Sequence, residues 1–181
     1  MSGQENERPD EVIERGPVTL RRWRPDDLDA LFAAVTESLD HLHPWAPWAA
    51  DYSRKTAEEY LAGSVKRWDE GTEYNYAIIT ADALAGSISL MARIGPGGLE
   101  IGYWVRRAYT RRGLATTAAA AMVEQAFRLP GVDRVEIVHE ELNAASGGVA
   151  RKLGFTQVER RPLEESSPGG NGVGVIWRLT R

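Results

Sequence analysis

The 181-residue chain contains no cysteine and only three histidines. Without cysteine there are no disulfide bonds, no thiolate metal sites and no cysteine nucleophile. A metal site would need carboxylates beside His41, His43 or His139, and no HExxH-like spacing occurs. We therefore expect no metal ion in this protein.

The sequence also lacks a long apolar run and an excess of basic residues. No stretch reaches the roughly 20 apolar residues of a membrane-spanning helix, and the N-terminus has no apolar segment typical of a signal peptide. The net charge of -4 argues against a general nucleic-acid binder, because binding driven by phosphates favours a basic surface. We expect a soluble cytoplasmic protein that binds neither membranes nor nucleic acid.

The length fits one domain, since domains commonly have about 100 to 200 residues. Residues 1–15 are polar and charged, which predicts a disordered N-terminal arm. Residues 16–181 are expected to form a single domain. No internal repeat or low-complexity tract occurs apart from an alanine-rich run after residue 114.

Hydrophobic periodicity and turn residues divide this domain into strands and helices. Strands are expected at residues 18–23, 73–80, 84–94, 99–105, 132–139, 155–161 and 173–180. Helices are expected at residues 26–38, 57–70, 113–129 and 143–152. Short turns predict an antiparallel meander, and the strand, helix and strand over residues 99–139 predict one parallel βαβ pair. The predicted fold is α+β, with a mixed, mostly antiparallel sheet of about seven strands and helices on both faces.

Local signals refine three of these boundaries. Asp26 or Asp27 is positioned to cap the first helix. Thr56 and Glu59 have the spacing of a capping box at the start of the second helix. Residues 162–172 are rich in Glu, Ser, Gly and Pro, which predicts a mobile loop before the last strand.

The most informative stretch is RRAYTRRGLATTAAAA, residues 106–121. It follows an apolar segment, turns at Gly113 and continues as a good helix former, so it predicts a strand, a basic loop and a helix N-terminus. Free main-chain N–H groups and the helix dipole make such an end an anion site, and nearby arginines favour phosphate. The alanines can equally serve only close helix packing, and the arginines can form a solvated face. A P-loop and a GxGxxG motif are both absent.

A second distinctive segment is HLHPWAPW, residues 41–48. Its two prolines exclude a regular helix across it. Trp45 and Trp48 therefore stand in a stiffened loop, either as a plug over the core or as one wall of a substrate cleft. These two interpretations are compatible.

Four motifs in this order resemble the GNAT acetyltransferase superfamily, and within it the RimJ/RimL-type N-acetyltransferases. The motifs are PWAPW, LEIGYWV, TRRGLATTA and NAASGGVARKLGF. The resemblance covers the chain from about residue 17 to its end. It departs from the usual loop pattern, Gln/Arg-x-x-Gly-x-Gly/Ala, at its first position, which is Thr110.

The resemblance implies that acetyl-CoA is the co-substrate and assigns residues to it. Its pyrophosphate would lie against Arg111, Arg112, Gly113, Leu114, Ala115 and Thr116. Its pantetheine arm would lie beside Tyr103, Trp104 and Val105, where the next parallel strand diverges to form a wedge. Asn143 matches an asparagine that contacts the cofactor amide. Gly102 and Trp104 also have ordinary roles in a strand, as a close contact and a core anchor.

The resemblance also implies candidate catalytic residues. Glu100 matches a recurring position of the general base, and Ser146 matches the serine assigned as the acid for the departing thiolate. Asn143 and Ser146 are equally good helix N-cap types, so capping is an alternative role for both. Glu100 would share its strand face with Trp104, which leaves a core role open for it. His139 and Glu140 are the alternative bases, at the end of the parallel strand.

We expect the chain to be an acetyl-CoA-dependent N-acetyltransferase. A direct transfer to a primary amine fits the sequence better than a covalent intermediate, because no Cys and no Ser/His/Asp arrangement is evident. The acceptor is a protein N-terminus or a small amine, beside a wall that contains Trp45 and Trp48. The alternative is an acyl-CoA-binding sensor or scaffold without turnover. Either a monomer or a homodimer is compatible with the sequence.

Overall fold

The computed structural model describes residues 7–81 and 83–181. Over these residues the chain forms one eight-stranded sheet with the order β1-β2-β3-β4-β5-β6-β8-β7. The strands are β1 (Val12–Arg15), β2 (Val18–Arg22), β3 (Glu73–Thr80), β4 (Ala83–Met91), β5 (Gly98–Val105), β6 (Arg134–Glu140), β7 (Thr156–Pro162) and β8 (Val173–Thr180). The helices are α1 (Leu28–Thr36), α2 (Leu39–Leu42), α3 (Arg54–Glu70), α4 (Leu114–Arg128) and α5 (Ala144–Lys152). Short 3₁₀ turns are η1 (Pro25–Asp27), η2 (Pro47–Ala49) and η3 (Arg107–Tyr109).

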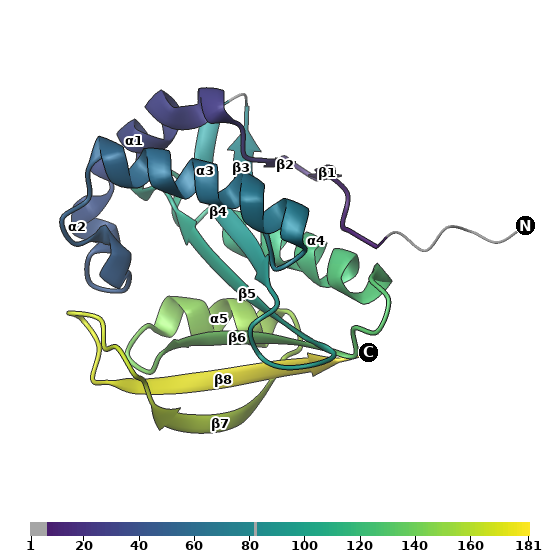
Figure 1. Cartoon of the computed structure of the whole chain (residues 1–181). Coiled ribbons are helices and arrows are strands. Elements are labelled where there is room, and N and C mark those ends of the chain that lie inside the picture. Colours follow the sequence, from purple (N-terminus) through teal and green to yellow (C-terminus); the bar gives the residue numbers. More distant parts are fainter. Residues whose placement is uncertain (1–6, 82) are drawn as a thin grey trace, which may run out of the picture.

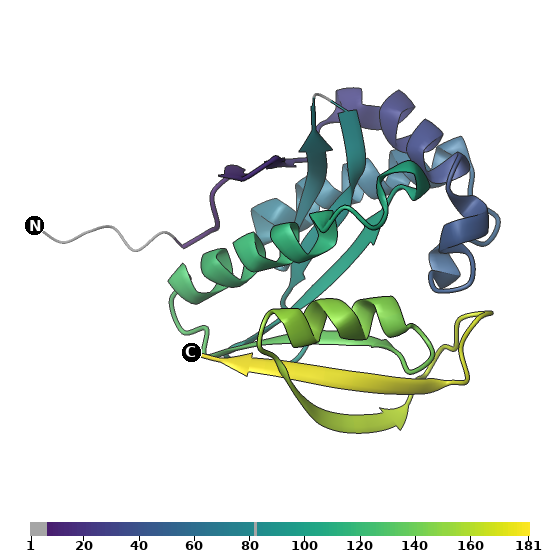
Figure 2. The same ribbon diagram turned by 180° about the vertical axis from the view of Figure 1, so that it is seen from behind.

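The sheet splits between its only parallel neighbours in the described residues, β5 and β6. These two strands pair over residues 98–101 and 134–137 and no further. Beyond that point β5 stays paired with β4 up to Val105, while β6 stays paired with β8 up to Glu140. Figures 1 and 2 show the two halves of the sheet meeting near the C-terminus and separating toward the opposite end. The predicted wedge beside β5 is therefore present.

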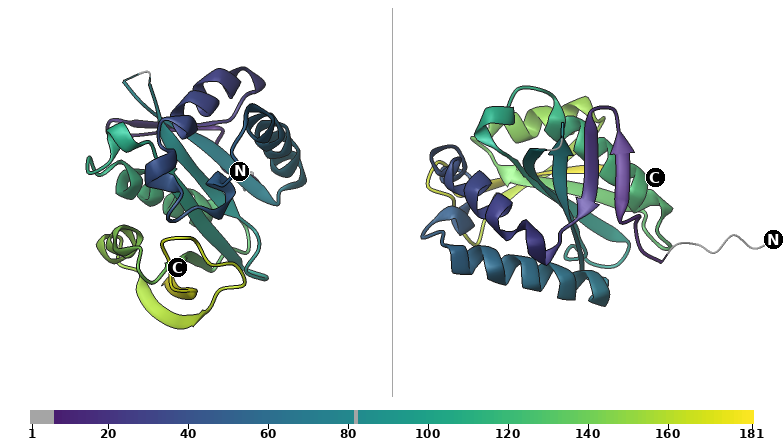
Figure 3. Two further views of the ribbon diagram at one scale, coloured as in Figure 1. Left: turned by 90° about the vertical axis from the view of Figure 1, so that its left-hand side faces the viewer. Right: turned by 90° about the horizontal axis from the view of Figure 1, so that it is seen from above.

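Helices cover both faces of the sheet, as predicted. One apolar cluster joins α1, α2 and α3 to Ala77 and Leu84, and the other joins α4 and α5 to the opposite face. Figure 3 shows α3 on one side of the sheet and the green helices α4 and α5 on the other. Ala118 and Ala119 of α4 are fully buried, and their small side chains allow the helix to pack closely on the sheet.

The structure adds one strand to the seven expected. Val12–Arg15 forms β1 and pairs with β2, although it falls within the arm that composition predicted to be disordered. The polar composition of this segment gives no local signal for a strand. The strand forms because its neighbour β2 supplies the backbone hydrogen bonds. Residues 1–6 of that arm lie outside the described part of the chain.

Two predicted helix starts differ in detail. The helix expected at residues 26–38 begins with the 3₁₀ turn η1 and ends at Thr36, followed by the short α2. The capping box expected at Thr56 and Glu59 is not the start of α3. Ser53 is the N-cap instead, and its hydroxyl accepts a hydrogen bond from the Thr56 N–H at 3.2 Å. The helix gains an extra turn because serine is as good a cap as threonine.

Candidate active site

A cavity of about 1570 Å³ lies where β5 and β6 separate. It is bordered by the start of α4, by α5, by α3 and by residues 40–48. Every predicted site residue except Arg112 lines it, from Trp45 to Ser146. The fold therefore brings together segments that are far apart in the sequence.

One end of the cavity is the N-terminus of α4. Gly113 precedes the helix with a φ of 72°, a left-handed conformation in which glycine is unstrained. The first hydrogen bond of the helix runs from the Thr117 N–H to the Gly113 carbonyl at 3.0 Å. The N–H groups of residues 114–116 thus precede the helical ladder, and no side chain of the described residues caps this end. These N–H groups and the positive end of the helix dipole form an anion site.

The arginines beside this end have different environments. Arg106 forms an ion pair with Glu37, so its charge is already compensated. The Arg107 N–H donates to the hydroxyl of Ser38 at 3.0 Å and anchors the loop. Arg111 is exposed and lines the cavity, so its guanidinium is available to an anion. Arg112 does not line the cavity, and its guanidinium carbon lies 5.0 Å from the centre of the Tyr109 ring.

The middle of the cavity runs along β5. Tyr103, Trp104 and Val105 lie beyond the last β5–β6 pair and line the cavity. Because the other edge of β5 is paired with β4, the main-chain groups on the β6 side have no strand partner in the described residues. A strand edge of this kind can bind an extended ligand through main-chain hydrogen bonds.

Asn143 and Ser146 lie next to this edge at the start of α5. The Asn143 side chain accepts a hydrogen bond from the Ser146 N–H at 3.4 Å, so the capping role of Asn143 is confirmed and Ser146 is not the cap. The hydroxyl of Tyr103 is buried and has no well-aligned hydrogen-bond partner among the described residues. Burial raises the pKa of Tyr103, and the nearby Ser146 hydroxyl opposes that rise. Two hydroxyl groups thus converge at one point of the cavity wall.

Glu100 is buried on β5 and faces the cavity as a partner of Arg93. The Arg93 Nε and Nη2 atoms donate to its two carboxylate oxygens at 3.0 and 2.5 Å. Hydrogen bonding to Glu100 raises the pKa of Arg93. The Arg93 side chain is 60% exposed while that of Glu100 is 9% exposed. The carboxylate is therefore held by a cation that can move away into solvent.

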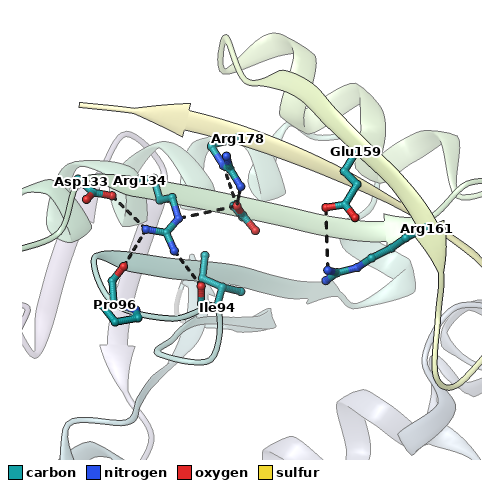
Figure 4. A network of polar contacts seen from close by, with 8 residues as sticks. Ile94, Pro96, Asp133, Arg134, Glu159, Arg161 and Arg178 are labelled. Atoms are coloured by element: carbon teal, nitrogen blue, oxygen red, sulfur yellow. Dashed lines mark hydrogen bonds and ion pairs between the residues drawn. The ribbon is translucent and has the colours of Figure 1, made fainter.

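Glu136 is a useful comparison because it is the β6 partner of Glu100 in the parallel register. It is equally buried and accepts hydrogen bonds from Arg178 at 2.6 and 2.8 Å. Figure 4 shows Arg134 and Arg178 directed toward this shared carboxylate, with Arg134 also bonded to the Ile94 and Pro96 carbonyls. Glu136 does not line the cavity, so its network is structural.

The structure separates the alternative bases, His139 and Glu140. Successive strand residues point to opposite faces of the sheet, so their side chains do not act together. Trp177 Nε1 donates to His139 Nε2 at 2.9 Å, and His139 Nδ1 lies 2.6 Å from the Glu140 carbonyl, which fixes Nδ1 as the protonated nitrogen. Burial lowers the pKa of His139. This imidazole is neutral and both its nitrogens are occupied.

The far end of the cavity is walled by aromatic side chains. Trp48 is 45% exposed, and its ring centre lies 6.1 Å from those of Trp104 and Tyr52. Trp45 is half-buried beside it and lines the same wall. Burial raises the pKa of Tyr52 to about 12, so this phenol is protonated at neutral pH and does not serve as a base.

Three polar residues of this end were missed in the sequence. Asn75, Ser87 and Ser89 line the cavity from β3 and β4. Ser87 donates to the Tyr76 carbonyl and accepts from the Trp23 indole, while the Ser89 hydroxyl bonds to the Asn75 side chain. The sequence did carry a signal for two of them. Ser87 and Ser89 stand two residues apart in an otherwise apolar strand, so they share one face of it.

Neither a membrane span nor a metal site is found in residues 7–81 and 83–181. No helix there is long and apolar enough to cross a bilayer. No group of three or more His, Asp or Glu side chains there is arranged to hold a metal ion.

Comparison with known proteins gives related sequences and folds. The Bacillus subtilis (strain 168) protein named "Probable N-acetyltransferase YjcK" is 32% identical over 145 residues, which are 76% of this chain and 80% of that protein. A RimL ribosomal L7/L12 alpha-N-protein acetyltransferase in complex with coenzyme A has a TM-score of 0.87 at 22% identity, covering 94% of this chain and 98% of that one. Mycobacterium smegmatis RimJ in complex with a CoA disulfide has a TM-score of 0.85 at 23% identity, with coverage of 95% and 88%.

The family assignment rests on the extent of the sequence match. The model of the acetyltransferase (GNAT) domain matches residues 18–156, most of the chain, and includes the split between β5 and β6 and the start of α4. The fold recurs in the RimL structure over 94% of this chain. The chain therefore belongs to the GNAT acetyltransferase family.

Proposed function

We propose that this enzyme transfers an acetyl group from acetyl-CoA directly to the α-amine of a protein N-terminus. One observation carries the proposal: the anion site at α4, the open edge of β5 and a polar side-chain end share one continuous cavity. Similar structures include a RimL protein, named for alpha-N-acetylation of L7/L12, and a RimJ protein, both bound to forms of CoA. The order of these features along the cavity supports binding of the acetyl-CoA thioester by main-chain groups at one end. It also supports entry of the amine from the opposite end.

The residues at the first end fit the pyrophosphate and pantetheine of acetyl-CoA. A Cβ atom at Gly113 would meet no protein atom within 4 Å, so the approach to the free N–H groups of residues 114–116 is open. Arg111 adds a cation beside it. The edge of β5 at residues 103–105 offers main-chain groups to the amide-containing arm. When bound, acetyl-CoA supplies the acyl group as a thioester.

Glu100 and Ser146 are the proposed proton carriers. An N-terminal amine has a pKa of about 7.7 to 8.0, so a carboxylate that accepts its proton increases the neutral fraction. The incoming ammonium would replace Arg93 at the carboxylate and give one proton to Glu100, and the neutral amine would then form the C–N bond. As the C–S bond breaks, the Ser146 hydroxyl, next to that of Tyr103, would supply a proton to the leaving thiolate and recover one from the new amide nitrogen, while Glu100 releases its proton to solvent.

The test is a thiol-release assay with acetyl-CoA and matched acceptors. A peptide with a free N-terminus is expected to release CoA and gain an acetyl group at its first residue by mass spectrometry. The same peptide with a blocked N-terminus and an internal lysine is the control. Turnover only with small amines would overturn the choice of a protein N-terminus. Acetyl-CoA binding by calorimetry with no release for any amine would favour a sensor instead.

A further inference from the structure

Glu140 is a buried carboxylate that the proposed chemistry does not use. It ends β6, lines the cavity and is 5% exposed. No Lys or Arg of the described residues forms an ion pair with it. Among residues 7–81 and 83–181, the groups that donate to its carboxylate are uncharged and lie in the loop between β7 and β8, which we call the 163–172 loop.

Four donors from this loop converge on the carboxylate. The Ser167 N–H and hydroxyl and the Ser166 hydroxyl donate to Oε1 at 2.9, 3.3 and 3.1 Å. The Asn171 N–H donates to Oε2 at 3.3 Å. Burial acts to raise the pKa of Glu140, but these hydrogen bonds outweigh it and lower the pKa. A carboxylate that is ionised and fully engaged is a poor proton acceptor but a strong anchor.

The loop also makes close main-chain contacts. A Cβ atom at Gly170 would lie 2.1 Å from the Glu140 carboxyl carbon, so a larger residue there would displace the carboxylate. On its other side the Gly169 N–H donates to the Pro44 carbonyl at 2.8 Å, directly before Trp45. A Cβ at Gly169 would lie 2.9 Å from that carbonyl oxygen. The loop is thus wedged between the end of β6 and the aromatic wall.

We propose that Glu140 is a positioning residue that fastens the 163–172 loop against residues 44–48 and so fixes the acceptor end of the cavity. The inference rests on the proposed function for its kinetic consequence. Glu140 is too firmly engaged to exchange protons with the amine. It acts through the loop and the wall containing Trp45 and Trp48. Its loss changes how well the acceptor binds and leaves acetyl-CoA binding at α4 unaffected.

The experiment compares Glu140→Gln with Gly170→Ala, because the second variant disturbs the contact while keeping the charge. Glu165→Gln is the control, since it removes an exposed carboxylate from the same loop. In both test variants the acceptor KM is expected to rise about tenfold, as for loss of a hydrogen bond to a charged group. The KM for acetyl-CoA and the kcat at saturating acceptor are expected to stay within about twofold.

Hydrogen exchange provides a readout that does not need turnover. Exchange of the 163–172 loop and of residues 44–48 is expected to quicken in both test variants and to stay unchanged in the control. If either test variant fails to fold, Ser166→Ala takes its place, because it removes one hydrogen-bond donor to Glu140 at an exposed position.

Three results would overturn the positioning role of Glu140. One is a lower kcat in Glu140→Gln with an unchanged acceptor KM, which would indicate proton transfer. Another is a defect in Glu140→Gln with none in Gly170→Ala, which would indicate a role of charge alone. The third is unchanged exchange in both variants. If the wild-type protein acetylates no amine, the proposed function fails, while hydrogen exchange still decides whether Glu140 fastens the 163–172 loop.

Discussion

The two ends of the cavity are built in different ways. The α4 end comes from one continuous segment, in which β5, the basic loop and the helix N-terminus follow each other directly. It presents mainly main-chain groups. The acceptor end takes side chains from β3, β4, β5 and α3 and from a wall at residues 44–48. A loop more than a hundred residues later contacts that wall.

This difference predicts different tolerance to substitution. A site made of main-chain N–H groups depends on backbone conformation, so most side chains around it can change without loss. A site made of side chains and inter-loop contacts depends on each of its partners. We therefore propose that specificity for the acceptor is set at the acceptor end of the cavity.

The largest effect is expected from Gly113→Val, which attacks the backbone of the α4 end. Valine is strained at a φ of 72°, and its side chain would occupy the open approach to the free N–H groups. Acetyl-CoA affinity is expected to fall about a thousandfold by calorimetry. Gly131→Val is the matched control, because Gly131 has a φ of 73° and an equally open Cβ position beyond the other end of α4. Equal affinity in the two variants would contradict the anion site.

A smaller effect, on rate, is expected from Glu100→Gln at the boundary between the two ends. Loss of a general base lowers kcat by about a hundredfold, with little change in acetyl-CoA affinity. Glu136→Gln removes the register partner of Glu100, an arginine-bound carboxylate outside the cavity. It is expected to lower the melting temperature and leave kcat per folded molecule unchanged. Similar rates in the two variants would exclude Glu100 as the base.

The smallest effect is expected from acid on the 163–172 loop. The pKa of Glu140 is lowered on folding, so its contribution is complete above the unfolded value of about 4.3 and is lost as pH falls through the lower folded value. Hydrogen exchange of the loop, corrected for intrinsic rates, is expected to show equal protection at about pH 7 and pH 5. Protection lost within that interval would mean that another group holds the loop.

Much of the α4 end could be predicted from the sequence, because the signals it uses are local. A turn at Gly113 before a run of helix formers indicates a helix N-terminus wherever the chain lies. The parallel pair also followed from order alone, since a strand, a helix and a strand of this length imply parallel neighbours. The separation of its two strands was implied only by the family resemblance. Arg112 was assigned with its neighbours, but its side chain lies over Tyr109 and outside the cavity.

The 163–172 loop shows what local signals miss. Its Glu, Ser, Gly and Pro content predicts mobility, yet the same serines and glycines are what allow it to wrap Glu140. Composition describes how a segment behaves alone, and this segment has a buried anion as its partner. The pairing of Glu100 with Arg93 was also missed, because it joins the turn after β4 to a side chain on β5.

The sequence by itself determined the order of the elements, the parallel pair, the helix N-terminus and the family, because each is written in neighbouring residues. Only the tertiary structure decided which carboxylates face the cavity and which are held elsewhere. Glu100, Glu136 and Glu140 look alike in the sequence. They differ because one faces the cavity beside an exposed arginine, one is held in an ion-pair network behind it, and one anchors a distant loop. Those partners are set by packing across the sheet, which local sequence does not record.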